Sequence, residues 1–460
     1  MPGVTDAAGP AHRSRPLRVA VVGAGPAGIY AAEALADQDD VPVAVDLVDR
    51  LPTPFGLVRH GIAPDHHKMR ALADTLRRTL DHDRVRFVGN AELGSDLTVA
   101  DLRAHTDAVV YTHGASGDRR LGIDGEDLPG SIAATDLVAW YTGHPDADRE
   151  LVETALARAH DVVVVGVGNV ALDVARVLAR SPGELADTDM PQHVLDALAA
   201  APVERITVLG RRGPAQATFT TQELRELGHL EAAVALVDTA GLDDESAVRA
   251  VARNLATLRE WADHEPLAGS VSVRLRFFAR PVRLEGTDRV TGVVVERTTV
   301  DAADRLTGTR EIDTVPADLV VRSIGYQGRS LPGLPVDDRT GVVANEAGRV
   351  LRDGVASPGE YVAGWIKRGP TGVVGTNKHD ARETVAALLE DAAAGRLGDG
   401  GPEDDLVDTL LARGAHPVLL DHWRAIDDAE TALGATQGRA RTTIHDRAAL
   451  LAHAHATPRR

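Results

Sequence analysis

Two glycine-rich segments of nearly the same pattern are candidate phosphate-binding loops. Their small residues follow a G-x-G-x-x-G/A spacing, at Gly23, Gly25 and Gly28 and again at Gly166, Gly168 and Ala171. In such a loop the first glycine permits a tight turn, the second lets the backbone approach a pyrophosphate, and the third lets the helix pack on the strand. The pyrophosphate lies at the helix N-terminus, where free N–H groups favour negative charge. Two loops predict two dinucleotide sites, an arrangement typical of enzymes that pass electrons between dinucleotides.

The residue that follows the second strand of each unit indicates which dinucleotide binds. Asp49 comes about 20 residues after the first loop, where a carboxylate accepts hydrogen bonds from ribose hydroxyls and repels a 2′-phosphate. The first site therefore favours FAD or NAD. The second unit carries Arg211 and Arg212 at this place, and their guanidinium groups suit the 2′-phosphate of NADP. Alternatively, Asp49 is only an aspartate in a turn, and Arg211 and Arg212 are only surface arginines.

A third glycine-rich segment, residues 364–375, reads GWIKRGPTGVVG. Its backbone N–H groups can approach the carbonyl groups of a flavin ring, and the helix that follows Gly372 would direct its N-terminus to the same place. Taken alone, the segment is more typical of an ordinary connection between a strand and a helix.

The elements that must position these loops follow a β-α-β pattern. Short apolar runs at 17–22, 41–49, 85–89 and 107–115 predict parallel strands, with a helix from Pro26. A second series begins at Asp161, residues 271–300 alternate like antiparallel strands, and a parallel pattern returns near 318. We predict an α/β fold of two doubly wound, Rossmann-like domains. A disordered leader spans 1–16, the first domain is split between 17–115 and 318–460, and the second, 116–317, is inserted into it.

The composition excludes several classes of protein. The chain of 460 residues contains no cysteine, which excludes disulfide bonds, a redox-active dithiol and a Cys-ligated iron–sulfur cluster. The formal net charge of −18 argues against general binding of nucleic acids. No apolar run reaches the roughly 20 residues needed to span a bilayer, and the leader lacks the apolar core of a signal peptide. We expect a cytoplasmic protein that binds neither nucleic acid nor membrane.

One segment is locally basic. Residues 59–78 hold five Lys or Arg against two Asp. The segment is either a solvated helix face or a docking surface for an acidic partner.

Longer motifs resemble a known family. They are VVGAGPAG, LPTPFGLVRHGIAPDH, GVGNVALDVAR, GRRGPAQATFTTQELREL and GWIKRGPTGVVGTNK. Over nearly the whole chain after the leader, the sequence resembles the adrenodoxin-reductase-like ferredoxin–NADP(+) reductases in their bacterial form. The resemblance implies an NADP domain inserted into an FAD domain. It also implies electron transfer between NADPH, which gives a hydride, and a ferredoxin-type iron–sulfur protein, which takes single electrons. The alternative is an NADPH-dependent flavin monooxygenase.

The resemblance also assigns residues to sites. With the first glycine loop, the FAD contacts are Gly23, Gly25, Ala27, Gly28, Asp49, Leu57, Leu93, Trp365, Gly372, Val373 and Val374. The NADP contacts are Gly168, Asn169, Val170, Ala171, Arg211, Arg212 and Glu223. The candidate catalytic residues are His66, Asp173 and Glu226, although Glu223 and Glu226 are also typical of a solvated acidic helix face. An acidic ferredoxin is expected to dock near Arg59, Lys68 and Arg70, with Lys367 and Arg368 as further candidates. No metal site is expected.

Overall fold

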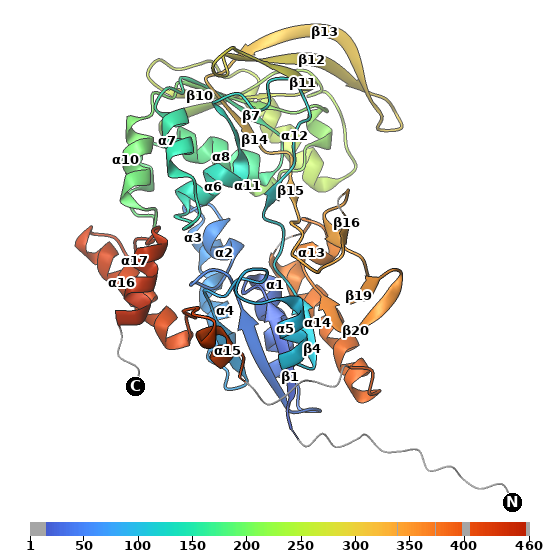
Figure 1. Ribbon diagram of the computed structural model, residues 1–460. Coiled ribbons are helices and arrows are strands. Elements are labelled where there is room, and N and C mark those ends of the chain that lie inside the picture. The colour runs from blue at the N-terminus through green and yellow to red at the C-terminus, as the bar shows by residue number, and fades with distance from the viewer. Residues whose placement is uncertain (1–14, 338, 373, 398–404, 457–460) are drawn as a thin grey trace, which may run out of the picture.

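The computed structural model describes residues 15–337, 339–372, 374–397 and 405–456, which form two lobes stacked one on the other (Figure 1). Of the predicted leader, only Arg15 and Pro16 belong to these residues. Within the described part of the chain, no helix is long and apolar enough to cross a membrane.

The first lobe is built on a seven-stranded sheet with the order β18-β19-β20-β4-β1-β2-β3. The strands from β20 to β3 are parallel, so their carboxyl ends meet at one edge. The strands are β1 (Leu17–Val22), β2 (Val43–Val48), β3 (Val85–Val88), β4 (Ala108–Tyr111), β18 (Asn345–Glu346), β19 (Arg349–Arg352) and β20 (Val355–Val362). Apolar clusters cover both faces of the sheet, which explains why β1 is an almost unbroken apolar run.

Helices and short strands complete the first lobe. Before the crossing to the second lobe, the helices are α1 (Pro26–Ala36), α2 (Leu57–His60), α3 (His67–Arg70), α4 (Leu72–Leu80) and α5 (Val99–His105). After the return come β16 (Val336–Asp337), β17 (Val342–Val343), α13 (Trp365–Arg368) and α14 (Val374–Ala393). The chain ends with α15 (Leu406–Ala412), α16 (Leu420–Thr436) and α17 (Arg447–Ala456). Helix α1 packs against α14, so segments from both ends of the chain build this lobe.

The second lobe is built on a six-stranded parallel sheet with the order β6-β14-β7-β8-β10-β9. Its strands are β6 (Ser131–Ala133), β7 (Asp161–Val165), β8 (Arg205–Leu209), β9 (Ala233–Val237), β10 (Val271–Arg276) and β14 (Leu319–Arg322). Its helices are α6 (Ala134–Tyr141), α7 (Arg149–Leu156), α8 (Asn169–Ala179), α9 (Pro182–Leu185), α10 (Gln192–Ala200), η1 (Pro214–Gln216), α11 (Thr221–Leu227) and α12 (Arg249–Trp261). The predicted α/β fold of two doubly wound domains is confirmed.

A separate antiparallel sheet covers the far end of the second lobe (Figure 1). It contains β11 (Ala279–Glu285), β12 (Gly292–Val300) and β13 (Leu306–Pro316). The antiparallel prediction for 271–300 was wrong for β10, which pairs in parallel with β8 and β9. The pattern of β10 alternates because Val273 and Leu275 on one face of the strand are buried, whereas Arg274 and Arg276 on the other face are partly exposed.

The chain crosses between the lobes through a two-stranded ribbon of β5 (Gly117–Asp118) and β15 (Tyr326–Gln327). The sequence prediction placed the return near residue 318. The structure instead places β14 between β6 and β7 of the second sheet, and the chain returns through β15. The run LVVR has the pattern of a buried parallel strand in either sheet, so its pairing partner is decided by tertiary structure.

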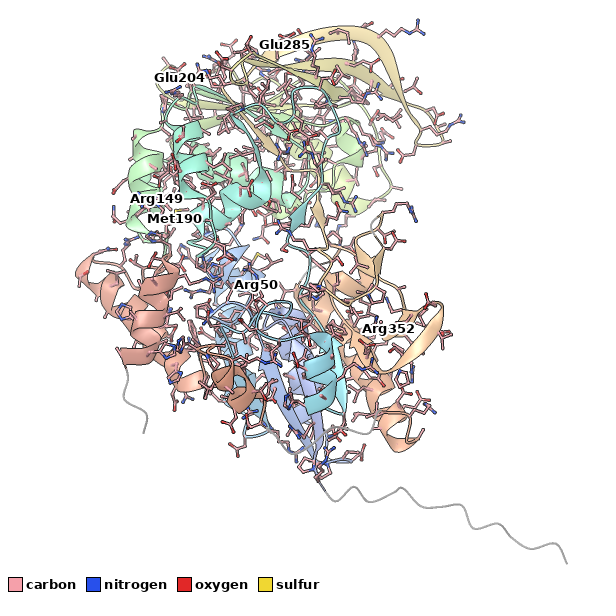
Figure 2. The ribbon with its side chains drawn as sticks, viewed as in Figure 1. Arg50, Arg149, Met190, Glu204, Glu285 and Arg352 are labelled. Atoms are coloured by element: carbon pink, nitrogen blue, oxygen red, sulfur yellow. The ribbon has the colours of Figure 1, made fainter. Side chains whose placement is uncertain are left out.

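The C-terminal segment, helix α17 included, also contacts the second lobe. Arg439 Nη1 donates to Met190 O at 2.7 Å, and Arg447 Nη2 donates to Asp146 Oδ1 at 2.9 Å. Asp146 pairs with Arg50 of the first lobe as well. Figure 2 shows Met190 and Arg50 in the region where the two lobes meet. These contacts fix the lobes on either side of the candidate site.

Candidate active site

The first glycine loop connects β1 to α1 and has the shape that a pyrophosphate requires. A Cβ at Gly28 would lie 1.8 Å from the carbonyl oxygen of Gly23, so only glycine allows the helix to approach the strand here. At Gly25, the N-cap of α1, a Cβ would meet only Gly56 Cα at 3.8 Å. No side chain caps α1, so its first N–H groups remain available to an anion.

Asp49, directly after β2, is joined to this loop. Its Oδ2 accepts a hydrogen bond from Ala24 N at 2.7 Å, and its Oδ1 accepts one from Leu51 N at 2.8 Å. Burial raises the pKa of Asp49, although both backbone hydrogen bonds act in the opposite direction. Each carboxylate oxygen retains a free lone pair, so Asp49 can still accept a ribose hydroxyl beside the loop.

The second loop connects β7 to α8 and repeats this geometry. Gly166 has φ +132°, and a Cβ there would lie 2.0 Å from Ser323 O. At Gly168, the N-cap of α8, a Cβ would meet only Thr218 Oγ1 at 3.5 Å, and no side chain caps the helix. Ala171, in the third position of the motif, is fully buried, as a residue at a tight helix–strand contact should be. The second loop therefore leaves the N-terminus of α8 as open as that of α1.

The two arginines after β8 differ in their surroundings. Arg211 is exposed, and its side chain has no hydrogen bond or ion pair with the residues that the structure describes. Arg212 Nη1 donates to Asp304 Oδ2 at 2.7 Å, and the Nε of Arg212 is buried without a partner. Arg211 is thus the freer of the two to bind a 2′-phosphate.

The glycine-rich segment after β20 lies against the first loop. A Cβ at Gly364 would be 2.6 Å from the Cβ of Ala27, which brings α13 close to the start of α1. Trp365, the first residue of α13, has a buried Nε1 without a hydrogen-bond partner among the described residues. A flavin ring offers carbonyl and nitrogen acceptors that suit such a donor, so this observation fits the expected FAD.

The other predicted cofactor contacts are placed as follows. Leu57 begins α2 and Leu93 is buried in the core behind the first sheet, while Asn169 and Val170 begin α8. Asn169 Oδ1 accepts a hydrogen bond from Thr220 N at 2.8 Å, which fixes the start of α8 against α11. Gly372 has φ +82°, Val374 begins α14, and Val373 lies outside the described residues.

The residues predicted to be catalytic meet between the lobes. His66 precedes α3 of the first lobe and is 7% exposed. Its Nε2 atom lies 2.9 Å from Asp173 Oδ1 on α8 and 3.1 Å from Glu223 Oε2 on α11. Its Nδ1 atom lies 3.7 Å from Glu226 Oε2. The structure therefore brings His66, Asp173 and Glu226 together and adds Glu223, which the resemblance had assigned to NADP.

Arg176, which the sequence analysis did not single out, holds this cluster together. It is 0% exposed and donates from Nε and Nη2 to the two oxygens of Asp65, at 2.7 and 3.0 Å. Its Nη2 lies 2.7 Å from Asp173 Oδ1, and its Nη1 lies 3.2 Å from Glu223 Oε2. Because Asp65 belongs to the first lobe and Arg176 to the second, this guanidinium joins the lobes. We call His66, Asp65, Asp173, Arg176, Glu223 and Glu226 the interlobe cluster.

The carboxylates of the interlobe cluster determine the charge of His66. Burial lowers the pKa of His66, but hydrogen bonds to Asp173 and Glu223 raise it by more, and the resulting pKa is about 10. Arg176 Nη2 lies 2.7 Å from His66 Nε2 and opposes this rise, but the two carboxylates outweigh it. His66 is therefore protonated at neutral pH and donates from Nε2.

His66, Asp173 and Glu223 have ligand-type atoms within 4.8 Å of one another, a spacing that could hold a metal ion. However, Arg176 already lies within hydrogen-bond distance of His66 and Asp173. The guanidinium therefore already places a positive charge among these ligand-type atoms.

The cations predicted to dock a partner are not all available. Arg59 is 8% exposed, donates from Nη1 to Glu430 Oε2 at 3.1 Å and lies 5.4 Å from the ring of Trp423. The docking prediction for Arg59 was therefore wrong, because a buried carboxylate holds this side chain inside the protein. Arg70 is half-buried and paired with Asp189, whereas Lys68 is exposed.

Lys367 and Arg368 are also mostly engaged inside the first lobe. The side chain of Lys367 is 9% exposed and pairs with Asp380 at 3.0 Å. Arg368 Nη2 donates to Asn377 Oδ1 at 2.8 Å. Both cations therefore brace α13 against α14 and are poorly placed to meet a partner.

Comparison with known proteins agrees with this geometry. Residues 17–212 match the family model described as pyridine nucleotide-disulphide oxidoreductase. The chain is 43% identical over 457 residues to the NADPH-ferredoxin reductase FprA of Mycobacterium tuberculosis, covering 95% of this chain and 99% of that protein. It is 36% identical over 462 residues to the mitochondrial NADPH:adrenodoxin oxidoreductase of Arabidopsis thaliana, covering 94% of each. The solved structure of M. tuberculosis FprA in complex with NADPH superposes with a TM-score of 0.90, at 42% identity, covering 96% of this chain and 100% of that one.

Proposed function

Because the chain belongs to the adrenodoxin-reductase-like family of ferredoxin–NADP(+) reductases, we propose that it transfers electrons between NADPH and a ferredoxin-type iron–sulfur protein through bound FAD. One observation carries the proposal above all. The N-termini of α1 in the first lobe and α8 in the second carry no side-chain cap. Asp49 is hydrogen-bonded to the loop before α1, and Arg211 follows β8, the strand next to β7. This asymmetry suits one dinucleotide without a 2′-phosphate and one with it.

The residues of the first lobe would hold FAD. The N-terminus of α1 binds the pyrophosphate, Asp49 accepts from a ribose hydroxyl, and the buried Nε1 of Trp365 donates to the ring. When bound, FAD accepts two electrons together and can release them one at a time, which a ferredoxin requires.

The residues of the second lobe would bind and orient NADPH. The N-terminus of α8 binds the pyrophosphate, and Arg211 binds the 2′-phosphate. Between the lobes, Asp173 and Glu223 hold a proton on His66 Nε2. Burial of His66 and Arg176 keeps this part of the site dry, which strengthens its electrostatic interactions.

The ferredoxin would dock close to His66. Lys68 is exposed in α3, two residues after His66, beside Met69, which is 41% exposed. A cation next to an apolar side chain suits the acidic surface of an electron carrier. Arg70 supports this surface indirectly, since it holds α3 by donating to Ile62 O at 3.0 Å. The cytoplasmic location expected from the sequence belongs to the same proposal.

The proposal is tested by the visible spectrum of the purified protein. We expect the absorption bands of oxidised flavin, which anaerobic NADPH bleaches much faster than NADH at equal concentration. A colourless protein that takes up no FAD, or equal bleaching by both coenzymes, would contradict the proposed function.

A further inference from the structure

Tyr141, the last residue of α6, has a buried hydroxyl that the fold does not satisfy. The residue is 0% exposed, and its hydroxyl oxygen has no hydrogen-bond partner among the described residues. The neighbouring polar groups are paired, since Trp140 Nε1 donates to Glu153 Oε1 at 3.3 Å and Thr142 Oγ1 donates to Val138 O at 2.7 Å. An unpaired buried hydroxyl lowers the stability of a protein by roughly 1–3 kcal/mol. We therefore expect the Tyr141 hydroxyl to bind a partner that does not belong to the described chain.

The hydroxyl of Tyr141 lies beside the interlobe cluster. Helix α6 packs against α8, which carries Asp173, and against β5, whose partner strand carries Tyr326. After burial, the charge of Asp173 contributes most to the raised pKa of Tyr141, and Tyr326 contributes next. Burial and then Asp173 also raise the pKa of Tyr326, to about 12. Two tyrosines from different elements thus gather around one carboxylate.

Further unpaired groups lie on the side of the first lobe. The ring of Tyr326 lies 5.4 Å from the ring of Trp365, tilted by 43°. The Nε1 of Trp365 is buried without a partner, as is the hydroxyl of Tyr141. Tyr141, Tyr326 and Trp365 therefore present hydrogen-bonding groups from the second lobe, the crossing ribbon and the first lobe, and the described part of the protein pairs none of them.

Helix α8 indicates which part of a dinucleotide reaches these groups. Its N-terminus at Gly168 suits the pyrophosphate, and Arg211 suits the phosphate on the adenosine side. Arg211 follows β8, and β14 flanks β7 on the opposite side, so the other half of the dinucleotide extends to the side of β14, where the chain continues to Tyr326. That half ends in a nicotinamide ring, whose carboxamide carries one carbonyl acceptor and one NH₂ donor. A tyrosine hydroxyl can pair with either.

We propose that the hydroxyl of Tyr141 binds the carboxamide of the NADP nicotinamide and holds the ring between the two lobes. This inference rests on the proposed function. The competing explanation is a structural water shared with Asp173. A water would stabilise the free protein, whereas the nicotinamide contact contributes only in the complex.

The test compares Tyr141→Phe with a matched control, Tyr361→Phe. Tyr361 is also buried, at 1% exposure, but its hydroxyl donates to Asp391 Oδ2 at 2.7 Å. Titration calorimetry of the oxidised, flavin-loaded protein measures the Kd of NADP+ and of adenosine 2′,5′-bisphosphate, which lacks the nicotinamide. Scanning calorimetry without either ligand measures the unfolding temperature.

We expect Tyr141→Phe to weaken NADP+ binding roughly 3- to 10-fold, the value of one neutral hydrogen bond. Binding of the bisphosphate and the unfolding temperature should remain those of the wild type. Tyr361→Phe should lower the unfolding temperature and leave NADP+ binding unchanged.

Three results would overturn the inference. They are wild-type affinity of Tyr141→Phe for NADP+, an equal loss with the bisphosphate, and a drop in unfolding temperature like that of the control, which would indicate the structural water. If the wild type itself binds no NADP+, the proposed function fails, and this inference fails with it.

Discussion

Replacing Arg211 with alanine should impair the use of NADPH and spare that of NADH. Arg211 is exposed and has no ion pair within the described chain, so its guanidinium loses no protein partner when it binds a phosphate. A charge-assisted hydrogen bond contributes about 1.5–3 kcal/mol. At 1.4 kcal/mol for each factor of ten, Arg211→Ala should lower kcat/KM for NADPH roughly 10- to 100-fold.

Arg212 should matter less than Arg211. Its Nη1 already donates to Asp304 at 2.7 Å, and this bond must be given up or shared when a phosphate binds. We therefore expect Arg212→Ala to lower kcat/KM for NADPH by less than Arg211→Ala does.

The assay is steady-state reduction of a small dye such as ferricyanide, with NADPH and NADH as separate donors. Arg424→Ala is the control, because Arg424 is an exposed arginine on α16, paired with Asp81 and Asp421, and should change neither value. An equal loss with both donors, or no loss with NADPH, would refute the assignment of the 2′-phosphate to Arg211.

Three further predictions concern charge. The raised pKa of His66 stabilises the fold fully at pH values below the unfolded pKa of about 6.5, and this contribution is lost as the pH rises towards about 10. The apparent unfolding temperature should therefore fall over that pH range, and it should fall less in His66→Gln. An equal dependence of the unfolding temperature on pH in the two proteins would contradict the ion pairing. Glu430→Gln should destabilise the protein by about 3 kcal/mol in calorimetry, because Arg59 keeps its buried charge without a counter-ion; an unchanged thermogram would argue otherwise. Lys68→Glu should slow ferredoxin reduction, increasingly so at low salt, and leave dye reduction intact, while parallel losses would exclude a docking role.

The glycine loops could be predicted from the sequence because their chemistry is local. Gly28 and Gly166 are required by contacts within the loop or with one adjacent strand, so spacing alone reveals them. Asp49 and Arg211 are placed by equally local features, since they follow the second strand of each β-α-β unit, β2 and β8, within two residues. For the same reason, α1 begins at Pro26, where the sequence predicts a helix.

The buried charges could not be predicted from the sequence, because they depend on contacts between residues that are distant in the sequence. Arg176 follows Asp173 by three positions, but only the packing of α8 against the turn at Asp65 shows that it is buried in the interlobe cluster. Arg59 belongs to a locally basic segment that is typical of a docking surface, yet a helix more than 300 residues later supplies its partner Glu430. Burial of charge is a tertiary property, which a local pattern does not encode.

The central claim is that electrons pass from NADPH to a ferredoxin, and a coupled assay tests it most directly. The flavin-loaded protein is mixed with NADPH, cytochrome c and increasing amounts of a bacterial ferredoxin, while oxygen uptake is recorded in parallel. The account predicts that cytochrome c reduction rises with ferredoxin and saturates, with little oxygen consumed. NADPH oxidation that is indifferent to ferredoxin and consumes oxygen in equal amount would contradict it and favour a monooxygenase.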